Sequence, residues 1–249
     1  MSLAVRVIAT ILCRGPIALK GRGFRASDRP VGSVLDAARV YSLRETDEIM
    51  ILDVLAGAHG DEPDYALVEH VSAGISVPLT VGGGIRTLEH VEKLLRSGAD
   101  RVVVSTGGLP LITEIATRFG SQAVVAALDV KDWRVYLDSG RAVLPYDPAS
   151  CPPACAAQRL QGAGCGEILL QSIERDGTMD GYDLALIKRV TEGARVPVVA
   201  SDTGGIPDMV RPGETGWLTP PGEATSLARA LREALADDAR LAATGRAAR

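Results

Sequence analysis

Short runs of β-branched residues alternate with amphipathic helical segments along most of this chain, and that alternation limits the possible folds more than any other feature. Because a strand that is followed by a helix returns to a parallel neighbour, the alternation predicts an α/β fold with a mainly parallel sheet. Strands are expected at residues 6–12, 48–54, 77–82, 101–106, 123–130, 168–170 and 196–201, with amphipathic helices such as 34–43, 65–73 and 88–97 between them.

The chain has 249 residues, which is the usual size of a (βα)8 TIM barrel. Two pairs of features recur at the same offset: Glu48 and Glu167 open similar strands, and Val77 and Val196 each open a strand with Val-Pro. Both offsets are 119 residues (167 − 48 and 196 − 77). We therefore predict a TIM barrel with two half-barrel repeats. Chance similarity between βα units is the alternative explanation of the repeat.

The composition excludes several classes of function. Hydrophobic residues make up 46% of the chain and charged residues 23%, and the net charge is −4. The sequence contains no stripe of basic residues that could bind nucleic acid, so we expect small-molecule partners and no nucleic acid. No apolar run approaches the length of a membrane span, and we expect a cytoplasmic protein. The four cysteines match no zinc or redox spacing, so the sequence predicts free thiols, no metal site and no cofactor.

Polar and glycine-rich loops follow several of the predicted strands, at the end where barrel enzymes bind their substrates. Backbone N–H groups and hydroxyls in such loops suit a phosphate. One phosphate site is predicted at Gly83, Gly84, Ser105 and Thr106, and a second at Asp176, Gly177 and Ser201. Two such sites imply a bisphosphorylated or sugar-phosphate ligand. The alternative is a set of structural turns with capping hydroxyls.

Asp129 ends a strand whose preceding residues are all apolar. A carboxyl group in such surroundings is partly desolvated, and this moves its pKa toward the range needed for proton transfer. Asp129 is therefore the best candidate for a catalytic acid or base, with the capping of a turn as the alternative. Asp53 ends its own strand in the same way and is a weaker candidate for an orienting group.

Four charged residues open predicted strands at the opposite end of the barrel: Arg6, Glu48, Arg101 and Glu167. Alternating charges on neighbouring strands are expected to converge into a closed ring on the barrel axis. Such a ring would control anything that passes along the axis. The alternative is a salt-bridge plug that only stabilises the fold.

The stretches 81–86, 111–122, 166–170 and 174–183 closely resemble the cyclase subunit of imidazole glycerol phosphate synthase, and the resemblance covers about residues 3–201. In that family a (βα)8 barrel receives ammonia from a glutaminase subunit docked at its N-terminal face. The ammonia converts a phosphoribosyl-formimino carboxamide ribotide into imidazole glycerol phosphate. The resemblance implies a lyase that works in histidine biosynthesis with a glutaminase partner.

The resemblance also implies roles for individual residues. Arg6, Glu48, Arg101 and Glu167 match the family's ammonia gate, with Arg101 where the family usually has lysine. Asp129 matches one of two catalytic aspartates, and Lys20 matches the basic residue of a mobile first loop. Gly84, Thr106, Asp176 and Gly177 match phosphate-binding positions.

This chain departs from the family where the second catalytic aspartate is expected, because Leu12 stands there, and Ser105 replaces an asparagine. A leucine cannot exchange a proton, so cyclisation by two carboxylates loses one partner. Leu12 and the stretch 20–25 resemble paralogues that supply ammonia for amidating a surface sugar. A non-catalytic barrel that only docks and activates a glutaminase is the alternative, and a related sugar-phosphate isomerase is a third.

After Ser201 the sequence resembles the C-terminal end of a GT-B glycosyltransferase. We therefore divide the chain into residues 1–201, which form barrel units one to seven, and a foreign tail at 202–249 in place of the eighth unit. Within the tail, residues 216–219 are expected to form a strand and residues 224–236 an amphipathic helix. Thr203 replaces a family glycine and would obstruct phosphate binding there.

Overall fold

The structure is a computed structural model that describes residues 6–137, 140–144, 152–178 and 181–201. Seven parallel strands form its sheet, in the spatial order β11-β10-β7-β6-β5-β4-β1. Their bounds are Ile8–Arg14 for β1, Glu48–Asp53 for β4, Leu79–Gly82 for β5, Arg101–Ser105 for β6, Val124–Lys131 for β7, Glu167–Ser172 for β10 and Val198–Ser201 for β11. The predicted parallel α/β fold is confirmed.

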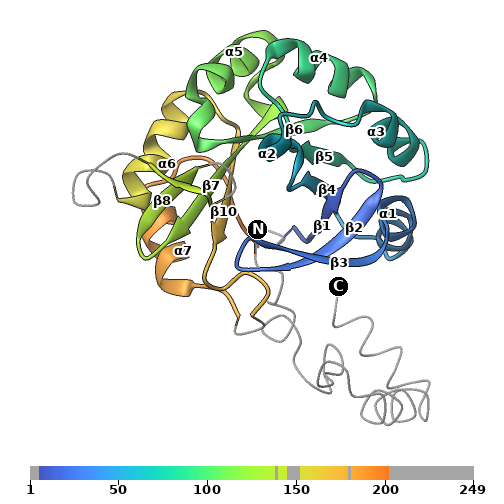
Figure 1. The fold of residues 1–249 in the computed structure, drawn as a ribbon. Coiled ribbons are helices and arrows are strands. Elements are labelled where there is room, and N and C mark those ends of the chain that lie inside the picture. The colour runs from blue at the N-terminus through green and yellow to red at the C-terminus, as the bar shows by residue number, and fades with distance from the viewer. Residues whose placement is uncertain (1–5, 138–139, 145–151, 179–180, 202–249) are drawn as a thin grey trace, which may run out of the picture.

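Helices follow the strands in sequence and lie on the outside of the sheet, which curls around a central axis (Figure 1). They are α1 (Val34–Leu43), the short α2 (Ala56–His59), α3 (Tyr65–Ser72), α4 (Leu88–Arg96), α5 (Leu109–Phe119), α6 (Pro153–Gly162) and α7 (Leu184–Thr191). Side chains accept hydrogen bonds from first-turn N–H groups at four of these helices, with Ser33, Asp64, Thr87 and Asp183 as the N-caps.

The two strands that follow a Val-Pro dipeptide begin two residues later than predicted. The Val-Pro dipeptides at 77–78 and 196–197 precede β5 and β11, which start at Leu79 and Val198. Proline has no N–H to donate to a ladder, so each can take part only through its carbonyl. Pro78 O accepts from Ile49 N, and Pro197 O accepts from Ile168 N, both at 3.0 Å.

The alternation of side chains along the strands separates two cores. The larger lies between the sheet and the helices and includes Ile49, Ile51 and Leu128. The smaller lies inside the curl and consists of Met50, Val103, Val125 and Leu169, from four different strands. A parallel sheet covered on both faces and curled in this way is consistent with a TIM-type barrel.

Among the described residues the parallel run ends at β1 on one side and at β11 on the other. The strand expected at 216–219, the helix expected at 224–236, and Thr203 all lie outside the described part of the chain.

Antiparallel strands extend the sheet at the C-terminal ends of the parallel strands β1 and β7. One hairpin follows β7, which pairs with β8 at Arg134–Leu137, and β8 pairs in turn with the short β9 at Ala142–Val143. A second hairpin, β2 (Ile17–Arg22) and β3 (Arg25–Ser33), follows β1 in the region predicted as a loop. None of the helices in the described residues is long and apolar enough to cross a membrane.

Candidate functional site

Four charged side chains meet at the N-terminal end of the parallel strands, as predicted. Arg101 donates to both carboxylates, through Nη1 to Oε2 of Glu167 at 2.6 Å and through Nη2 to Oε2 of Glu48. Arg6 also donates to Oε1 of Glu167 and lies 3.5 Å from Glu48 Oε2. Each arginine therefore bridges both glutamates, and we call these four residues the charged ring.

The charged ring is buried on its acidic side. Glu48 is 1% exposed and Glu167 is 4% exposed. Thr80 donates from Oγ1 to Oε1 of Glu48 at 2.6 Å, so both oxygens of that carboxylate have partners. Burying a carboxylate is unfavourable unless it is paired and hydrogen-bonded, and both conditions hold here. The Arg6 side chain is 38% exposed and faces the outside of this end.

An apolar layer separates the charged ring from the other end of the strands. It is the inner core of Met50, Val103, Val125 and Leu169. Along β4, every second side chain points to the inside of the curl: Glu48, then Met50, then Leu52. The charged ring, the apolar layer and the C-terminal end therefore follow one another along the axis.

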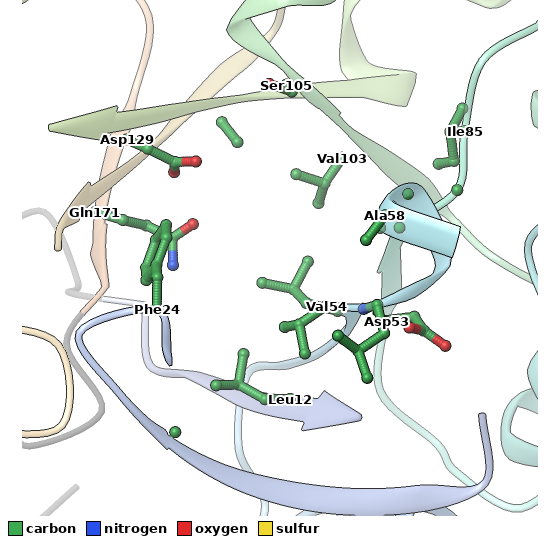
Figure 2. A pocket seen from close by; sticks show the side chains of 18 of the residues that line it. Leu12, Phe24, Asp53, Val54, Ala58, Ile85, Val103, Ser105, Asp129 and Gln171 are labelled. Atoms are coloured by element: carbon green, nitrogen blue, oxygen red, sulfur yellow. Dashed lines mark hydrogen bonds between the residues drawn. The ribbon is translucent and has the colours of Figure 1, made fainter. Parts of the chain in front are cut away.

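The C-terminal ends of the strands surround a cavity of about 320 Å³. One side of the cavity is apolar, with Leu12, Val54 and Val103 directed into it (Figure 2), and Leu52 also lines the cavity. Asp129 and Gln171 lie on the opposite side, on neighbouring strands whose Cα atoms pair in register. Further lining residues are Leu19, Gly21, Phe24, Asp53, Leu55, Gly57, Ala58, Gly82, Gly83, Gly84, Ile85, Arg86, Ser105, Ala127, Arg141 and Asp176.

Asp129 is the most unusual group in this cavity. It is 5% exposed, and its Oδ1 is the one fully buried side-chain oxygen or nitrogen without a hydrogen-bond partner in the described part of the chain. Burial and, to a lesser extent, the nearby charge of Asp176 together raise the pKa of Asp129 to about 7. The carboxyl group is thus poised to exchange a proton near neutral pH, as its place in the sequence predicted.

Asp53 lies at the equivalent strand end but is engaged differently. Its Oδ1 accepts from the backbone N–H groups of Leu55 and Ala56, and its Oδ2 accepts from that of Gly15, all at 2.9 Å. The carboxylate points away from Asp129 (Figure 2). Asp53 therefore shapes the loops after β1 and β4.

The first predicted phosphate site is partly assembled. Gly83, Gly84 and Ser105 line the cavity. Gly83 has φ +109, and a Cβ there would collide with the backbone oxygen of Asp53, so only glycine fits this turn. Thr106 is buried, begins a short 3-10 turn and donates from Oγ1 to Ala127 O at 2.5 Å, and it is not one of the residues that line the cavity.

The second predicted site is more dispersed. Asp176 lines the cavity, and Gly177 packs against the β2–β3 hairpin. Ser201 lines a different, much smaller pocket that it shares with Ser172 and Asp183. Lys20 is exposed on β2 and does not contribute to the cavity lining.

Sequence reasoning missed four residues that line the cavity: Phe24, Arg86, Arg141 and Gln171. Strand alternation could have found Gln171, since it follows Glu167 and Leu169 at the same spacing of two. The two arginines bring cationic groups to the cavity lining, and Arg86 is oriented by donating from Nη2 to Asp61 O at 2.7 Å.

No group of three or more potential metal ligands occurs among the residues that the structure describes. Cys13, Cys155 and Cys165 are free thiols there, and burial raises the pKa of Cys165 to about 11.

Comparison with known proteins agrees with this geometry. A family model described as "Histidine biosynthesis protein" matches residues 14–210. The chain belongs to this family. A second model, "Glycosyl transferases group 1", matches residues 193–249, so the similarity of the tail to a glycosyltransferase is also found.

Three relatives carry the name imidazole glycerol phosphate synthase subunit HisF. The protein from Anoxybacillus flavithermus is 41% identical over 209 residues, covering 80% of this chain and 81% of the relative. The protein from Myxococcus xanthus is 38% identical over 216 residues, with 84% and 83% covered. The protein from Chlorobaculum parvum is 39% identical over 210 residues, with 82% and 81% covered.

Proposed function

We propose that this chain is an ammonia-using synthase subunit that works with a glutaminase docked over the charged ring. The observation that carries the proposal is that the charged ring and the Asp129 cavity lie at opposite ends of the same strands. On β10, for example, Glu167 belongs to the ring and Gln171 to the cavity. The names of the relatives, which are subunits of imidazole glycerol phosphate synthase, support the same class of reaction.

The apolar layer suits transfer of neutral ammonia between the two ends. An ammonium ion or a hydronium ion would lose its hydration there without compensation, whereas uncharged ammonia loses much less. The layer is packed, with Met50 and Leu169 fully buried, so passage requires the ring and the layer to open together. Arg6 is the ring member most exposed to a docked partner, and the partner's contact with Arg6 would trigger this opening.

At the cavity, Asp129 would act as the acid and base. As the nitrogen of ammonia bonds to an electrophilic carbonyl carbon, the protonated carboxyl group donates its proton to the carbonyl oxygen. The resulting carboxylate then accepts a proton from the nitrogen, which restores Asp129. Its pKa of about 7 matches both steps.

Leu12 favours a sugar-phosphate acceptor over the family's ribotide. Leu12 pairs in register with Leu52, both line the cavity, and Leu12 lies on the side opposite Asp129 (Figure 2). A reaction that needs a second carboxylate there has none, whereas ammonia addition needs only Asp129. Arg86, Gly83 and Gly84 would hold the phosphate at the cavity wall.

Cyclisation of the ribotide is the second candidate, favoured by the 41% identity to a HisF subunit over most of the chain. The assay supplies the purified chain with an ammonium salt and the phosphoribosyl-formimino carboxamide ribotide, with the Anoxybacillus flavithermus subunit as positive control. We expect cyclisation at least 100-fold slower than the control, and a gain of activity in Leu12→Asp, because a lost acid–base partner costs about 10²–10⁴-fold. Cyclisation at the control rate by the unchanged chain would reject the sugar-phosphate acceptor.

A half-barrel origin would explain why the two glutamates of the ring, Glu48 and Glu167, occupy matching positions. The elements β10, α7 and β11 each begin 119 residues after β4, α3 and β5 (167 − 48, 184 − 65 and 198 − 79). The helices α3 and α7 also share an aspartate N-cap, Asp64 and Asp183. We further propose that the tail supplies the eighth βα unit between β11 and β1. Deletion of residues 202–249 would then expose two sheet edges, so we expect the shortened chain to aggregate more than the full chain.

A further inference from the structure

The tip of the β2–β3 hairpin rests on the loop that follows β10. The backbone N–H of Gly23 donates to the carbonyl of Asp176 at 2.8 Å, and that of Phe24 donates to the Asp176 carboxylate at 3.2 Å. Phe24 lines the cavity, as Gln171 does (Figure 2). The hairpin therefore covers part of the cavity, and Asp176 connects the hairpin tip to the loop that follows β10.

The turn at this tip is strained. Arg22 pairs with Arg25, so Gly23 and Phe24 form a two-residue turn, with φ of +60 and +55. Such a turn normally carries asparagine or glycine, and a bulky side chain at positive φ is unfavourable. The surroundings must hold Phe24 in this conformation, and the two bonds to Asp176 do so.

The loop beneath the tip is shaped to receive it. A Cβ on Gly177, which has φ +69, would lie 2.5 Å from Gly21 O and 3.0 Å from Arg22 Cα. A Cβ on Gly140 would lie 3.2 Å from the Phe24 ring. Only glycine at these two positions leaves room for the hairpin tip and the ring.

The chemistry of Asp176 suits this contact better than contact with a phosphate. A carboxylate accepts hydrogen bonds and repels a phosphate, and Asp176 is 4% exposed with an oxygen on the Phe24 N–H. We propose that Asp176 is a positioning residue that holds Phe24 and the hairpin tip as a roof over the Asp129 cavity, and that it is not a ligand of a substrate phosphate. Its consequence for turnover, exclusion of water from Asp129, rests on the proposed function.

Hydrogen exchange of the Phe24 amide tests the proposal in the free protein. In Asp176→Ala the amide loses its acceptor and we expect exchange at least about tenfold faster, whereas Asp176→Asn keeps an acceptor oxygen and should stay within about threefold of the original rate. Asp183→Ala is the matched control, since Asp183 accepts from Leu186 N on the adjacent helix and does not contact the hairpin. Unchanged exchange in Asp176→Ala would overturn the proposal.

Gly177→Ala provides a second route if Asp176→Ala does not fold. Its methyl group pushes the tip away without touching the carboxylate, so the Phe24 amide should again exchange faster. Titration with inorganic phosphate separates the two roles of Asp176: a loss of phosphate binding of tenfold or more in Asp176→Asn, with exchange unchanged, would make it a ligand and reject the proposal. Failure of the proposed function would instead appear as no ammonia-dependent product from the unchanged chain, which leaves the exchange result standing.

Discussion

The buried carboxyl groups at the two ends of the curled sheet differ in whether they have hydrogen-bond and ion-pair partners. At the N-terminal end, each carboxylate of the charged ring meets both arginines, and Glu48 also meets Thr80. At the C-terminal end, Asp129 is as deeply buried, yet its Oδ1 has no partner among the described residues. A satisfied cluster favours one closed arrangement, whereas an unsatisfied carboxyl group favours binding of a proton or a ligand.

The largest expected effect concerns the satisfied end. Glu48→Ala leaves Arg6 and Arg101 facing one carboxylate, and breaking such a buried network costs about 3–5 kcal/mol in the free energy of unfolding. Urea unfolding measures this loss. Glu92→Ala is the control, because Glu92 pairs with Arg96 and Arg118 on the surface and its removal costs less than about 1 kcal/mol. Equal losses in the two variants would mean that the charged ring contributes no more than a surface ion pair.

The next effect concerns activity at the unsatisfied end. Asp129→Asn keeps the shape of the side chain and removes its exchangeable proton, so ammonia-dependent product formation should fall roughly 10³-fold. Activation of a docked glutaminase should be unchanged, since Asp129 lies at the far end from the ring. Retained product formation would favour the non-catalytic barrel.

The same carboxyl group makes stability depend on pH. The pKa of Asp129 is raised from 3.8 to about 7 in the folded protein, so the folded state binds the proton more tightly than the unfolded state does. Stability from this group is full below pH 3.8 and is lost as pH rises to about 7. Between pH 5 and pH 8 the unfolding free energy should fall by about 2–3 kcal/mol, and this difference should disappear in Asp129→Asn. A pH profile identical in both proteins would contradict the raised pKa.

The residues at these two ends could be predicted from the sequence where the period of two along a strand determines which way a side chain points. The charged ring was predictable because Glu48, Arg101 and Glu167 each open a strand and Arg6 lies just before β1, and parallel strands place such residues at one edge. Ser105 and Thr106 were predicted together, yet Ser105 ends β6 and lines the cavity with Val103 two residues before it, whereas Thr106 begins the 3-10 turn and is not part of the lining. Applying this period of two throughout would have found Gln171 and separated Thr106.

The β2–β3 hairpin could not be predicted by the same means. Its turn residues, Gly23 and Phe24, lack the Asn-Gly signature of a two-residue hairpin. The conformation of Phe24 depends on Asp176, which is 152 residues away in the chain. Lys20 was assigned to the substrate site on the assumption of a loop, and on β2 it is exposed and outside the cavity lining. Tertiary contact, which short-range patterns do not report, determines this part of the site.

The smallest expected effect concerns the Thr80 hydroxyl, the uncharged donor to the charged ring, and its contribution to the free energy of unfolding. Thr80→Val keeps the shape of a fully buried side chain and removes the 2.6 Å hydrogen bond to Glu48 Oε1. Because both arginines still neutralise Glu48, the cost should be about 1–2 kcal/mol, well below that of Glu48→Ala. Thr113→Val is the control, since its hydroxyl donates to Leu109 O on the exposed face of α5, and its effect should be near zero. A loss in Thr80→Val that matches the loss in Glu48→Ala would mean that the closed ring depends on this hydroxyl as much as on its charges.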